Sequence, residues 1–382
     1  MRNPFDPPVE PMSSQQATPA QKERQAQASW KKTSTFFIFL ACAVYLLLMY
    51  GPKIAPQKDL TLGGSEGIIQ DGVYYVYGGS GFSTTNQSKT PIGLCAYVPG
   101  QEPEVLVSSK DYSLDVVFPS WDVNSHGLYF VDLNTETLYR MDLETQEISN
   151  LYSLPEAPKG TNPYNFPNGL WEDRIALICH DGVDTYHLVL DCRTGEVLSR
   201  EEDNEPGTRW NLVAGDRILV HNLTDDDSDL LENGVSVLPQ GHKLYTEDTR
   251  AIGDAILMAS YPADAATTEC THQLFLPDGR TLALPKGTED TYYRFLAVSG
   301  QWLFYTSHEK DPTPNVTKFY TELRAMDVNT QESYLVSTEY DPYFAVTDGN
   351  WFYSYGDYTN CYQLEYNDQG IPCGLTLIEK DI

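Results

Sequence analysis

The sequence of 382 residues has few basic side chains and few cysteines. It contains 25 Lys and Arg against 54 Asp and Glu, and beyond residue 58 the counts are 18 and 51, a balance of −33. A segment this acidic repels nucleic acid phosphates and anionic lipid headgroups, which excludes nucleic acid as a partner. The seven cysteines show no C-x-x-C spacing, so the usual sign of a thiolate metal site is missing.

Sequence motifs of catalysis are missing as well. There is no G-x-S-x-G nucleophile turn, no H-E-x-x-H helix, no phosphate-binding glycine loop and no sialidase-type Asp-box turn. So many acids guarantee some close carboxylate pairs, and a pair for glycoside chemistry therefore stays open without being indicated. We expect no cofactor and favour a protein without catalytic activity.

Six cysteines lie beyond the apolar run that contains Cys42, and an even number outside the cytoplasm permits disulfides. The pairs nearest in sequence are Cys179 with Cys192 and Cys361 with Cys373. Folding each hairpin about its turn places neither pair directly opposite. Buried free thiols are therefore the favoured interpretation. The other two of the six are Cys95 and Cys270.

Residues 33–51 carry no charge and are long and apolar enough for one transmembrane helix. The alternative, a cleaved signal peptide, would need a shorter leading segment and an A-x-A-like site. Four Lys or Arg shortly before the run against two shortly after it predict a cytoplasmic amino terminus. Residues 1–32, rich in Pro, Gln, Ser and Ala, are predicted to be a disordered cytoplasmic tail. Residues 52–59 then form a linker to an extracytoplasmic domain at the plasma membrane, residues 60–382.

A strand-like unit recurs along that domain. "GLYFVDL" at 127 has counterparts in "GVYYVYG" at 72, "RIALICH" at 174, "RILVHNL" at 217, "AILMASY" at 255, "QWLFYTS" at 301 and "NWFYSYG" at 350. Their short alternating patterns and abundant tyrosine indicate strands. Consecutive copies begin 38 to 55 residues apart, which is the period of four-stranded propeller blades.

Each copy can be completed to four strands. A short segment precedes the marked strand, a hairpin partner such as "TLYRMDL" follows it, and a fourth segment such as "EISNLYS" closes the unit. The turns "DLETQE", "DCRTGE", "LPDGRT" and "DVNTQE" separate the third and fourth segments. The sequence therefore predicts an all-β fold, a β-propeller of seven blades, with six or eight also possible because the fourth and fifth copies are irregular.

The pattern "FPSW…GLYFVDL…TLYRMDL.TQEISNL" resembles the blades of TolB-like propellers. The domain is also similar to membrane-anchored bacterial propellers distantly like the receptor-related propellers. The resemblance covers about residues 60 to 380 and implies a fold and a habit of binding, not an activity. The sequence departs from many TolB-like blades, because "SWDVNSHG" stands where they carry S-P-D-G.

In a propeller, the connections from fourth to first strand and from second to third strand emerge on one face, and loops on a rigid scaffold carry function. Aromatic rings beside amides and carboxylates there can bind sugars or act as protein-binding hot spots. The predicted ligand-binding face consists of Phe82, Tyr164, Asn165, Phe166, Asp181, Trp210, His221, Tyr292, Tyr293, Tyr320, Tyr343 and Tyr358.

Two weaker signals concern metals. Asp225, Asp227 and Asp229 could offer carboxylates to calcium, but Leu230 stands where the calcium loop needs Gly, so a solvated loop is favoured. Three of the marked strands have a histidine at or just past their carboxyl end, namely His180, His221 and His308. These three histidines belong to different blades, which makes a shared metal ion an unfavoured interpretation. We expect no metal at either place.

Together these features predict a single-pass membrane protein that displays a non-catalytic binding or scaffolding propeller. Its partners would be the membrane, through residues 33–51, and a protein or cell-envelope glycan ligand. The alternative is a surface enzyme acting on polysaccharide, a glycoside hydrolase or lyase, with a carboxylate pair at the channel mouth.

Overall fold

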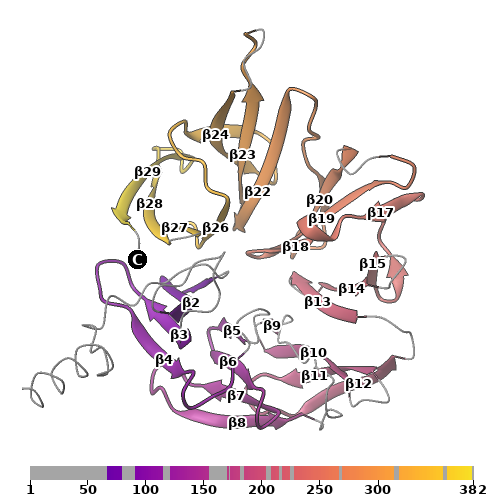
Figure 1. Ribbon diagram of the computed structural model, residues 1–382, viewed down its shortest axis with the longest axis vertical. Helices are drawn as coiled ribbons and strands as arrows, with labels where there is room; N and C mark the ends of the chain where they lie inside the picture. Colours follow the sequence, from indigo (N-terminus) through magenta and orange to yellow (C-terminus); the bar gives the residue numbers. More distant parts are fainter. Residues whose placement is uncertain are drawn as a thin grey trace, which may run out of the picture. The chain divides into compact units, whose positions relative to one another are not determined.

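The computed structural model describes residues 67–79, 91–114, 121–154, 170–171, 173–180, 185–203, 208–214, 217–223, 228–265, 269–313, 318–355 and 359–380. They belong to one compact unit, residues 59–382. Their strands form seven antiparallel sheets arranged as blades around a common centre (Figure 1). The domain is a seven-bladed β-propeller, which confirms the favoured blade count.

Every blade is built from strands that are consecutive in the sequence and that follow one another from the centre outward (Figure 1). The exception is blade 5, where β17 and β18 both pair with β19. Blade 1 contains β1 (Ile68–Gln70), β2 (Val73–Gly79), β3 (Pro91–Tyr97) and β4 (Glu104–Ser108). Blade 2 contains β5 (Trp121–Asn124), β6 (Gly127–Asp132), β7 (Thr137–Met141) and β8 (Ile148–Ser153). Blade 3 contains β9 (Leu170–Trp171), β10 (Arg174–His180), β11 (Thr185–Asp191) and β12 (Val197–Asp203).

The remaining four blades follow the same plan. Blade 4 contains β13 (Thr208–Ala214), β14 (Arg217–Leu223), β15 (Ser228–Glu232) and β16 (Val235–Ser236). Blade 5 contains β17 (His242–Leu244), the 3-10 turn η1 (Thr246–Asp248), β18 (Arg250–Ile252), β19 (Ala255–Pro262), β20 (Thr271–Phe275) and β21 (Thr281–Ala283). Blade 6 contains β22 (Thr291–Ser299), β23 (Trp302–Lys310), β24 (Phe319–Asp327) and β25 (Ser333–Ser337). Blade 7 contains β26 (Phe344–Thr347), β27 (Trp351–Tyr355), β28 (Asn360–Tyr366) and β29 (Pro372–Glu379).

The seven strands found by their repeating sequence are the second strands of the seven blades. They are β2, β6, β10, β14, β19, β23 and β27. A second strand has a hydrogen-bonded neighbour on each edge and a blade against each face, so both of its faces are apolar. In β6 all six residues are buried. These strands are therefore the strongest signal of the repeat in the sequence.

One turn with the pattern Asp-x-x-Thr-Gln/Gly-Glu joins the third and fourth strands in blades 2, 3 and 6. In blade 6 the carboxylate of Asp327 accepts hydrogen bonds from the backbone N–H of Asn329 and Thr330, at 2.7 and 3.3 Å. The fifth residue, Gln331, has a φ of 61°. The matching aspartates are Asp142 and Asp191, and the matching left-handed residues are Gln146 and Gly195.

Blades 1 and 7 meet without sharing a strand. β1 to β4 all come from the start of the domain and β26 to β29 all from its end. The contact is aromatic: the rings of Tyr74 and Tyr353 stack with centroids 4.3 Å apart, and Tyr97 meets Tyr353 edge-on at 6.1 Å. Side-chain packing, not a mixed sheet, therefore closes the ring among the described residues.

The inner strands of blades 5 and 6 approach very closely beside their turns. Gly253, with a φ of 67°, forms an isolated parallel bridge with Val298. A Cβ atom at Gly253 would lie 2.0 Å from the Val298 carbonyl oxygen. Glycine is therefore required here both for the left-handed conformation and for the close approach.

The predicted tail, residues 1–32, and the predicted span, residues 33–51, lie outside the described residues. In the part of the chain that the structure describes, no helix has the length and apolar character needed to cross a membrane.

Candidate functional site

The twelve residues of the predicted binding face are described to different extents. Phe82, Tyr164, Asn165, Phe166, Asp181 and Tyr358 lie outside the described residues. Trp210 and His221 pair across β13 and β14 in blade 4, where the backbone alone is described. The remaining four, Tyr292, Tyr293, Tyr320 and Tyr343, all belong to blades 6 and 7 or the loop between them.

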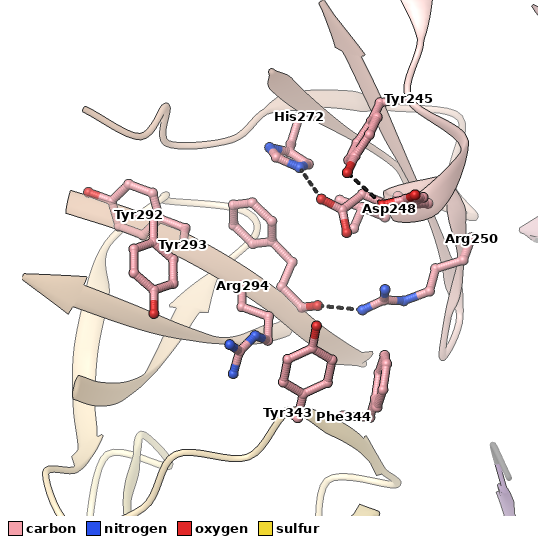
Figure 2. Close-up of a pocket in the computed structure, with 12 residues that line it drawn as sticks. Tyr245, Asp248, Arg250, His272, Tyr292, Tyr293, Arg294, Tyr343 and Phe344 are labelled. Carbon is pink, nitrogen blue, oxygen red and sulfur yellow. Dashed lines mark hydrogen bonds and ion pairs between the residues drawn. The ribbon is translucent and has the colours of Figure 1, made fainter. Parts of the chain in front are cut away.

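Three of those four tyrosines line one pocket. Its volume is about 300 Å³, and its walls come from blade 5, the start of β22 in blade 6 and the segment that enters β26 in blade 7 (Figure 2). The lining residues are Tyr245, Glu247, Asp248, Arg250, Leu257, His272, Tyr292, Tyr293, Arg294, Phe295, Tyr343 and Phe344. The connections from the fourth strand of one blade to the first strand of the next end at the starts of the inner strands. The pocket therefore lies on the face where the sequence analysis predicted a binding site.

An interruption of the inner strand of blade 5 shapes the pocket. β17 and β18 both pair with β19, Leu244 opposite Ser260 and Arg250 opposite Leu257. Five residues of the inner strand therefore lie opposite only two of β19, and the surplus forms η1. This bulge brings the side chains of Glu247 and Asp248 to the pocket wall.

Asp248 accepts a hydrogen bond from His272, whose Nε2 lies 3.4 Å from the Asp248 Oδ2 atom. The hydrogen bond from His272 is the main cause that lowers the pKa of the Asp248 carboxyl; burial opposes it, and the nearby guanidinium groups of Arg250 and Arg294 act in the same direction as the hydrogen bond. The ring of His272 packs against Phe295 with centroids 5.1 Å apart. Asp248 is therefore an ionised, hydrogen-bond-accepting group in the pocket near neutral pH.

Tyr245 and Glu247 form a second polar pair at the rim. The hydroxyl of Tyr245 donates to the Glu247 Oε2 atom at 2.7 Å. This hydrogen bond raises the pKa of Tyr245 to about 12, with burial adding to the effect. The phenol therefore stays protonated and holds the carboxylate of Glu247 in one orientation.

Two arginines point into the pocket from blades 5 and 6 (Figure 2). Arg250 donates from Nη2 to the carbonyl oxygen of Phe295 at 2.9 Å, and its guanidinium lies 5.6 Å from the centre of the Phe344 ring. Arg294 donates from Nη1 to Asp341 and to the carbonyl of Pro342, at 3.3 and 3.2 Å.

The exposed rings at the site are held in place from below. Tyr343 is 61% exposed and rests on the guanidinium of Arg294, 4.2 Å from the ring centre. Tyr292 is 41% exposed and stacks on His308, with centroids 4.1 Å apart and an interplanar angle of 5°. His308 itself is buried, between the hydroxyls of Thr306 and Thr321. Each ring is thus packed on a neighbouring side chain while a large part of its surface stays exposed.

Tyr320 lies outside the pocket. It is 51% exposed, its hydroxyl donates to Asp311 at 2.9 Å, and the ammonium of Lys318 lies 5.1 Å from its ring centre. In β24 it alternates with Phe319, which contacts Tyr292 at 5.4 Å on the other face of the blade. The structure therefore brings Tyr292, Tyr293 and Tyr343 together and separates Tyr320 from them.

The charged half of the pocket was missed by sequence reasoning. Asp248, Arg250, His272 and Arg294 were not among the predicted residues. The segments "TEDTR" and "TYYR", which end at Arg250 and Arg294, are the only local signals: each places polar residues at the start of an inner strand. Their convergence depends on the positions of three blades, which a single sequence does not contain.

The metal and disulfide expectations concern other parts of the domain. Asp225 and Asp227 lie outside the described residues, and Asp229 accepts a hydrogen bond from the Ser236 hydroxyl at 2.7 Å. Across the described ranges, no three His, Cys, Asp or Glu side chains are grouped to hold a metal ion. The six described cysteines are free thiols, and Cys179 and Cys361 lie opposite Tyr186 and Glu379 instead of other cysteines. Thus neither candidate disulfide is formed.

Comparison with known proteins identifies the fold. No family model and no curated protein matches the chain. Acylaminoacyl peptidase from Pyrococcus horikoshii is similar over 79% of this chain and 51% of its own, with a TM-score of 0.50 and 12% identity. The β-propeller domain of the Trilobed protease from Pyrococcus furiosus matches 84% of this chain and 99% of its own, with a TM-score of 0.51 and 10% identity. TolB from Acinetobacter baumannii is also among the similar structures, over 68% of this chain and 62% of its own, with a TM-score of 0.39 and 15% identity.

The chain spans about half the length of the similar peptidase. At identities of 10 and 12%, the similarities to the peptidase and to the Trilobed protease domain show the propeller fold and nothing finer. The site must therefore be interpreted from its own residues.

Proposed function

We propose that this propeller is a non-catalytic binding module and that the pocket between blades 5, 6 and 7 is its ligand site. The observation that carries the proposal is the pocket itself: exposed, fixed tyrosine rings adjoin two arginines and two carboxylates on one face. Concave sites with aromatic walls and a few oriented polar groups are typical of ligand binding. The ligand would be a protein or a cell-envelope glycan.

Residues 33–51 would anchor this module in the plasma membrane, with the propeller outside the cytoplasm. The basis is the uncharged apolar run and the Lys/Arg bias around it. Accessibility of an epitope tag at each end of the chain in intact cells tests this orientation. A tag protected at the amino terminus and exposed at the carboxyl terminus is the expected result.

The enzyme alternative has one point in its favour, since Glu247 and Asp248 are two carboxylates in one pocket. A glycosidase, however, needs one carboxyl with a raised pKa to protonate the leaving group. Asp248 has a lowered pKa because His272 donates a hydrogen bond to it. Asp248 therefore suits hydrogen bonding better than proton donation, and binding is the function that the pocket supports best.

The full chain in detergent, immobilised through its amino terminus, provides the test of binding. It would be exposed to envelope glycans and to envelope proteins, beside a variant carrying Tyr292→Ala and Tyr343→Ala. Leu335→Ala, which alters another exposed apolar side chain of blade 6, serves as the control. We expect capture that the double substitution abolishes and the control retains. Capture that is unaffected by the double substitution would contradict the proposal.

A further inference from the structure

The carboxylates and the guanidinium groups that line the pocket are equal in number. Glu247 and Asp248 contribute two carboxylates, and Arg250 and Arg294 contribute two guanidinium groups. Such a set offers hydrogen-bond acceptors and donors side by side without attracting a net anion or a net cation. The surrounding domain is strongly acidic, so a polyanionic ligand would also meet long-range repulsion. The electrostatics favour a neutral, strongly hydrogen-bonding ligand.

Much of this hydrogen-bonding capacity is unused. Arg250 has five N–H donors, and the Phe295 carbonyl takes a hydrogen bond from one nitrogen. Within the described part of the chain, Arg250 forms no ion pair shorter than 4 Å, in contrast to Arg294, which pairs with Asp341. Asp248 binds His272 through Oδ2, and its second oxygen has further lone pairs. An acceptor at the end of η1 and a donor at the start of β18 are thus available two residues apart in the chain.

Vicinal hydroxyl groups offer the chemistry that complements this pair. Each sugar hydroxyl both donates and accepts, so one can donate to Asp248 while its neighbour accepts from Arg250. A protonated amine would satisfy Asp248 alone, and a carboxylate would satisfy Arg250 alone. A diol therefore uses both groups, and hydrogen bonds to charged partners are among the stronger ones.

The exposed rings supply the apolar part of such a site. Tyr343 packs on the guanidinium of Arg294, and its ring lies roughly perpendicular to that of Phe344, with centroids 4.7 Å apart. Its exposed surface is a platform on which the C–H face of a pyranose ring can stack. A rigid aromatic ring gives contact area at a small cost in conformational entropy.

The dimensions suit a chain end. A volume of about 300 Å³ lies at the lower limit of ligand pockets, which is room for one or two sugar rings. Tyr292 and Phe319 continue the aromatic surface outward along blade 6, with exposures of 41 and 38%. A second or third ring could lie on this extension while the terminal ring occupies the pocket.

We propose that the pocket binds the terminal pyranose of a neutral glycan, with Tyr343 as the stacking platform and Asp248 and Arg250 as the hydroxyl acceptor and donor. This inference rests on the proposed binding function and specifies its ligand class. Tyr292 and Phe319 extend the site to the neighbouring sugar.

The test uses the full chain in a detergent without a sugar headgroup and soluble probes of defined chemistry. The neutral probes are the hexamers of glucose in α and β linkage, of mannose and of N-acetylglucosamine. Hexagalacturonate is the acidic probe and hexalysine the basic one. Saturation-transfer NMR identifies the bound rings and titration calorimetry measures Kd. We expect at least one neutral hexamer to bind and the two charged probes not to bind.

Four variants assign the contacts. Tyr343→Ala should weaken neutral binding by about tenfold, because it removes the stacking face. Tyr343→Phe, which keeps the ring, should stay within about threefold. Asp248→Asn and Arg250→Gln should each weaken binding by about tenfold, because hydrogen bonds to charged groups are lost. As a control, Leu335→Ala should leave Kd unchanged.

The outcomes separate the two proposals. Binding of hexagalacturonate or hexalysine alone would overturn the neutral-ligand inference while retaining the pocket as a binding site. Capture of an envelope protein that depends on Tyr343, with no neutral hexamer bound, would overturn the glycan inference and retain the binding function. Neutral binding that is insensitive to Tyr343, Asp248 and Arg250 would overturn this assignment of the site. No bound probe and no Tyr343-dependent capture would overturn both.

Discussion

The imidazole of His308 lies face to face with the phenol of Tyr292, with 4.1 Å between ring centroids and 5° between ring planes. His308 is 1% exposed and Tyr292 is 41% exposed. A buried, titratable ring thus supports an exposed ring at the edge of the pocket. The protonation of the lower ring therefore bears on the stability of blade 6.

Stability should decrease as the pH is lowered because of His308. Burial lowers the pKa of this imidazole below its ordinary value of 6.5, Asp341 opposes the change and Arg294 adds to it. The neighbouring Thr306 and Thr321 are uncharged hydroxyl partners. Since the unfolded chain takes up the proton first, the contribution of His308 is present above pH 6.5 and is lost as the pH falls from there toward the lower folded-state pKa.

The measurement is the melting temperature between about pH 5 and pH 8 for the wild type and for His308→Gln, a range that spans the titration of histidine. The wild type should lose more stability below pH 6.5 than the variant does. His126→Gln, at the turn between β5 and β6 in blade 2, is the control and should follow the wild type. Parallel curves for all three proteins would contradict the neutral, buried state of His308.

Gly253→Ala should destabilise the domain strongly. The new Cβ would meet the Val298 carbonyl at 2.0 Å, between the inner strands of blades 5 and 6. Gly279→Ala is a matched control, because Gly279 also has a positive φ, of 86°, but has no atom within 4 Å of a Cβ. We expect a loss of roughly 1 to 2 kcal/mol for the control from backbone conformation alone and at least about 1 to 3 kcal/mol more for Gly253→Ala. Equal denaturation midpoints would show that the close approach is unimportant.

Gln331→Gly should stabilise the protein slightly. Gln331 holds a φ of 61° in the turn between β24 and β25, a conformation that costs a side-chain-bearing residue about 1 to 2 kcal/mol. Part of the gain is offset by the greater backbone freedom of glycine in the unfolded chain, which leaves about 0.5 to 1 kcal/mol. Urea denaturation measures the change. Gln146→Gly, the equivalent change in blade 2, repeats the test in a second turn and should give the same sign; a loss of stability at both positions would contradict the prediction.

Tyr353→Ala tests how the ring is closed. Tyr353 is fully buried between Tyr74 and Tyr97 of blade 1, and removal of a buried aromatic ring costs about 3 to 5 kcal/mol. Leu377→Ala, on the outer strand of the same blade, changes a side chain that is 48% exposed and should cost less than about 1 kcal/mol. Similar losses for the two variants would mean that the aromatic contact is not the main closure.

Thiol labelling should distinguish the cysteines of the folded protein. Cys373 is exposed, whereas burial raises the pKa of Cys95 and Cys179 to about 12 and that of Cys361 to about 11. Because the thiolate is the reactive form, a maleimide at about pH 7.5 should modify Cys373 quickly and the other three only after unfolding. Peptide mapping by mass spectrometry measures the order. Protection of Cys373 would contradict a free, exposed thiol.

The fold could be predicted from sequence because its strongest signal repeats. The second strands are apolar on both faces, as β6 shows, so each stands out against its neighbours. The aspartate turns recur in three blades with the same hydrogen bonds. Weak local signals thus become decisive when they return at a blade-sized interval.

The site could be predicted only in part. Tyr292, Tyr293 and Tyr343, which line the candidate pocket, were among the predicted residues because aromatic rings beside polar groups on this face favour binding. η1 was not predicted, because the interruption between β17 and β18 is defined by their pairing with β19. Only that pairing shows that the inner strand has more residues than β19 has partners for. Nothing in the sequence distinguishes Arg250 and Arg294 from other charged residues, and only the strands of two blades place them in one pocket.

The contact between blade 1 and blade 7 affects how the number of blades in such a domain could change. Each sheet is one uninterrupted stretch of chain, and blades 1 and 7 are joined by aromatic contacts such as that of Tyr74 with Tyr353. Duplication or deletion of one whole stretch would therefore leave the hydrogen bonds within every other sheet intact, and only the packing between blades would have to adjust. In a propeller whose last sheet contains a strand from the opposite end of the domain, the same change would also have to preserve that shared sheet. The closure by side chains seen here therefore permits a change in blade number by whole blades.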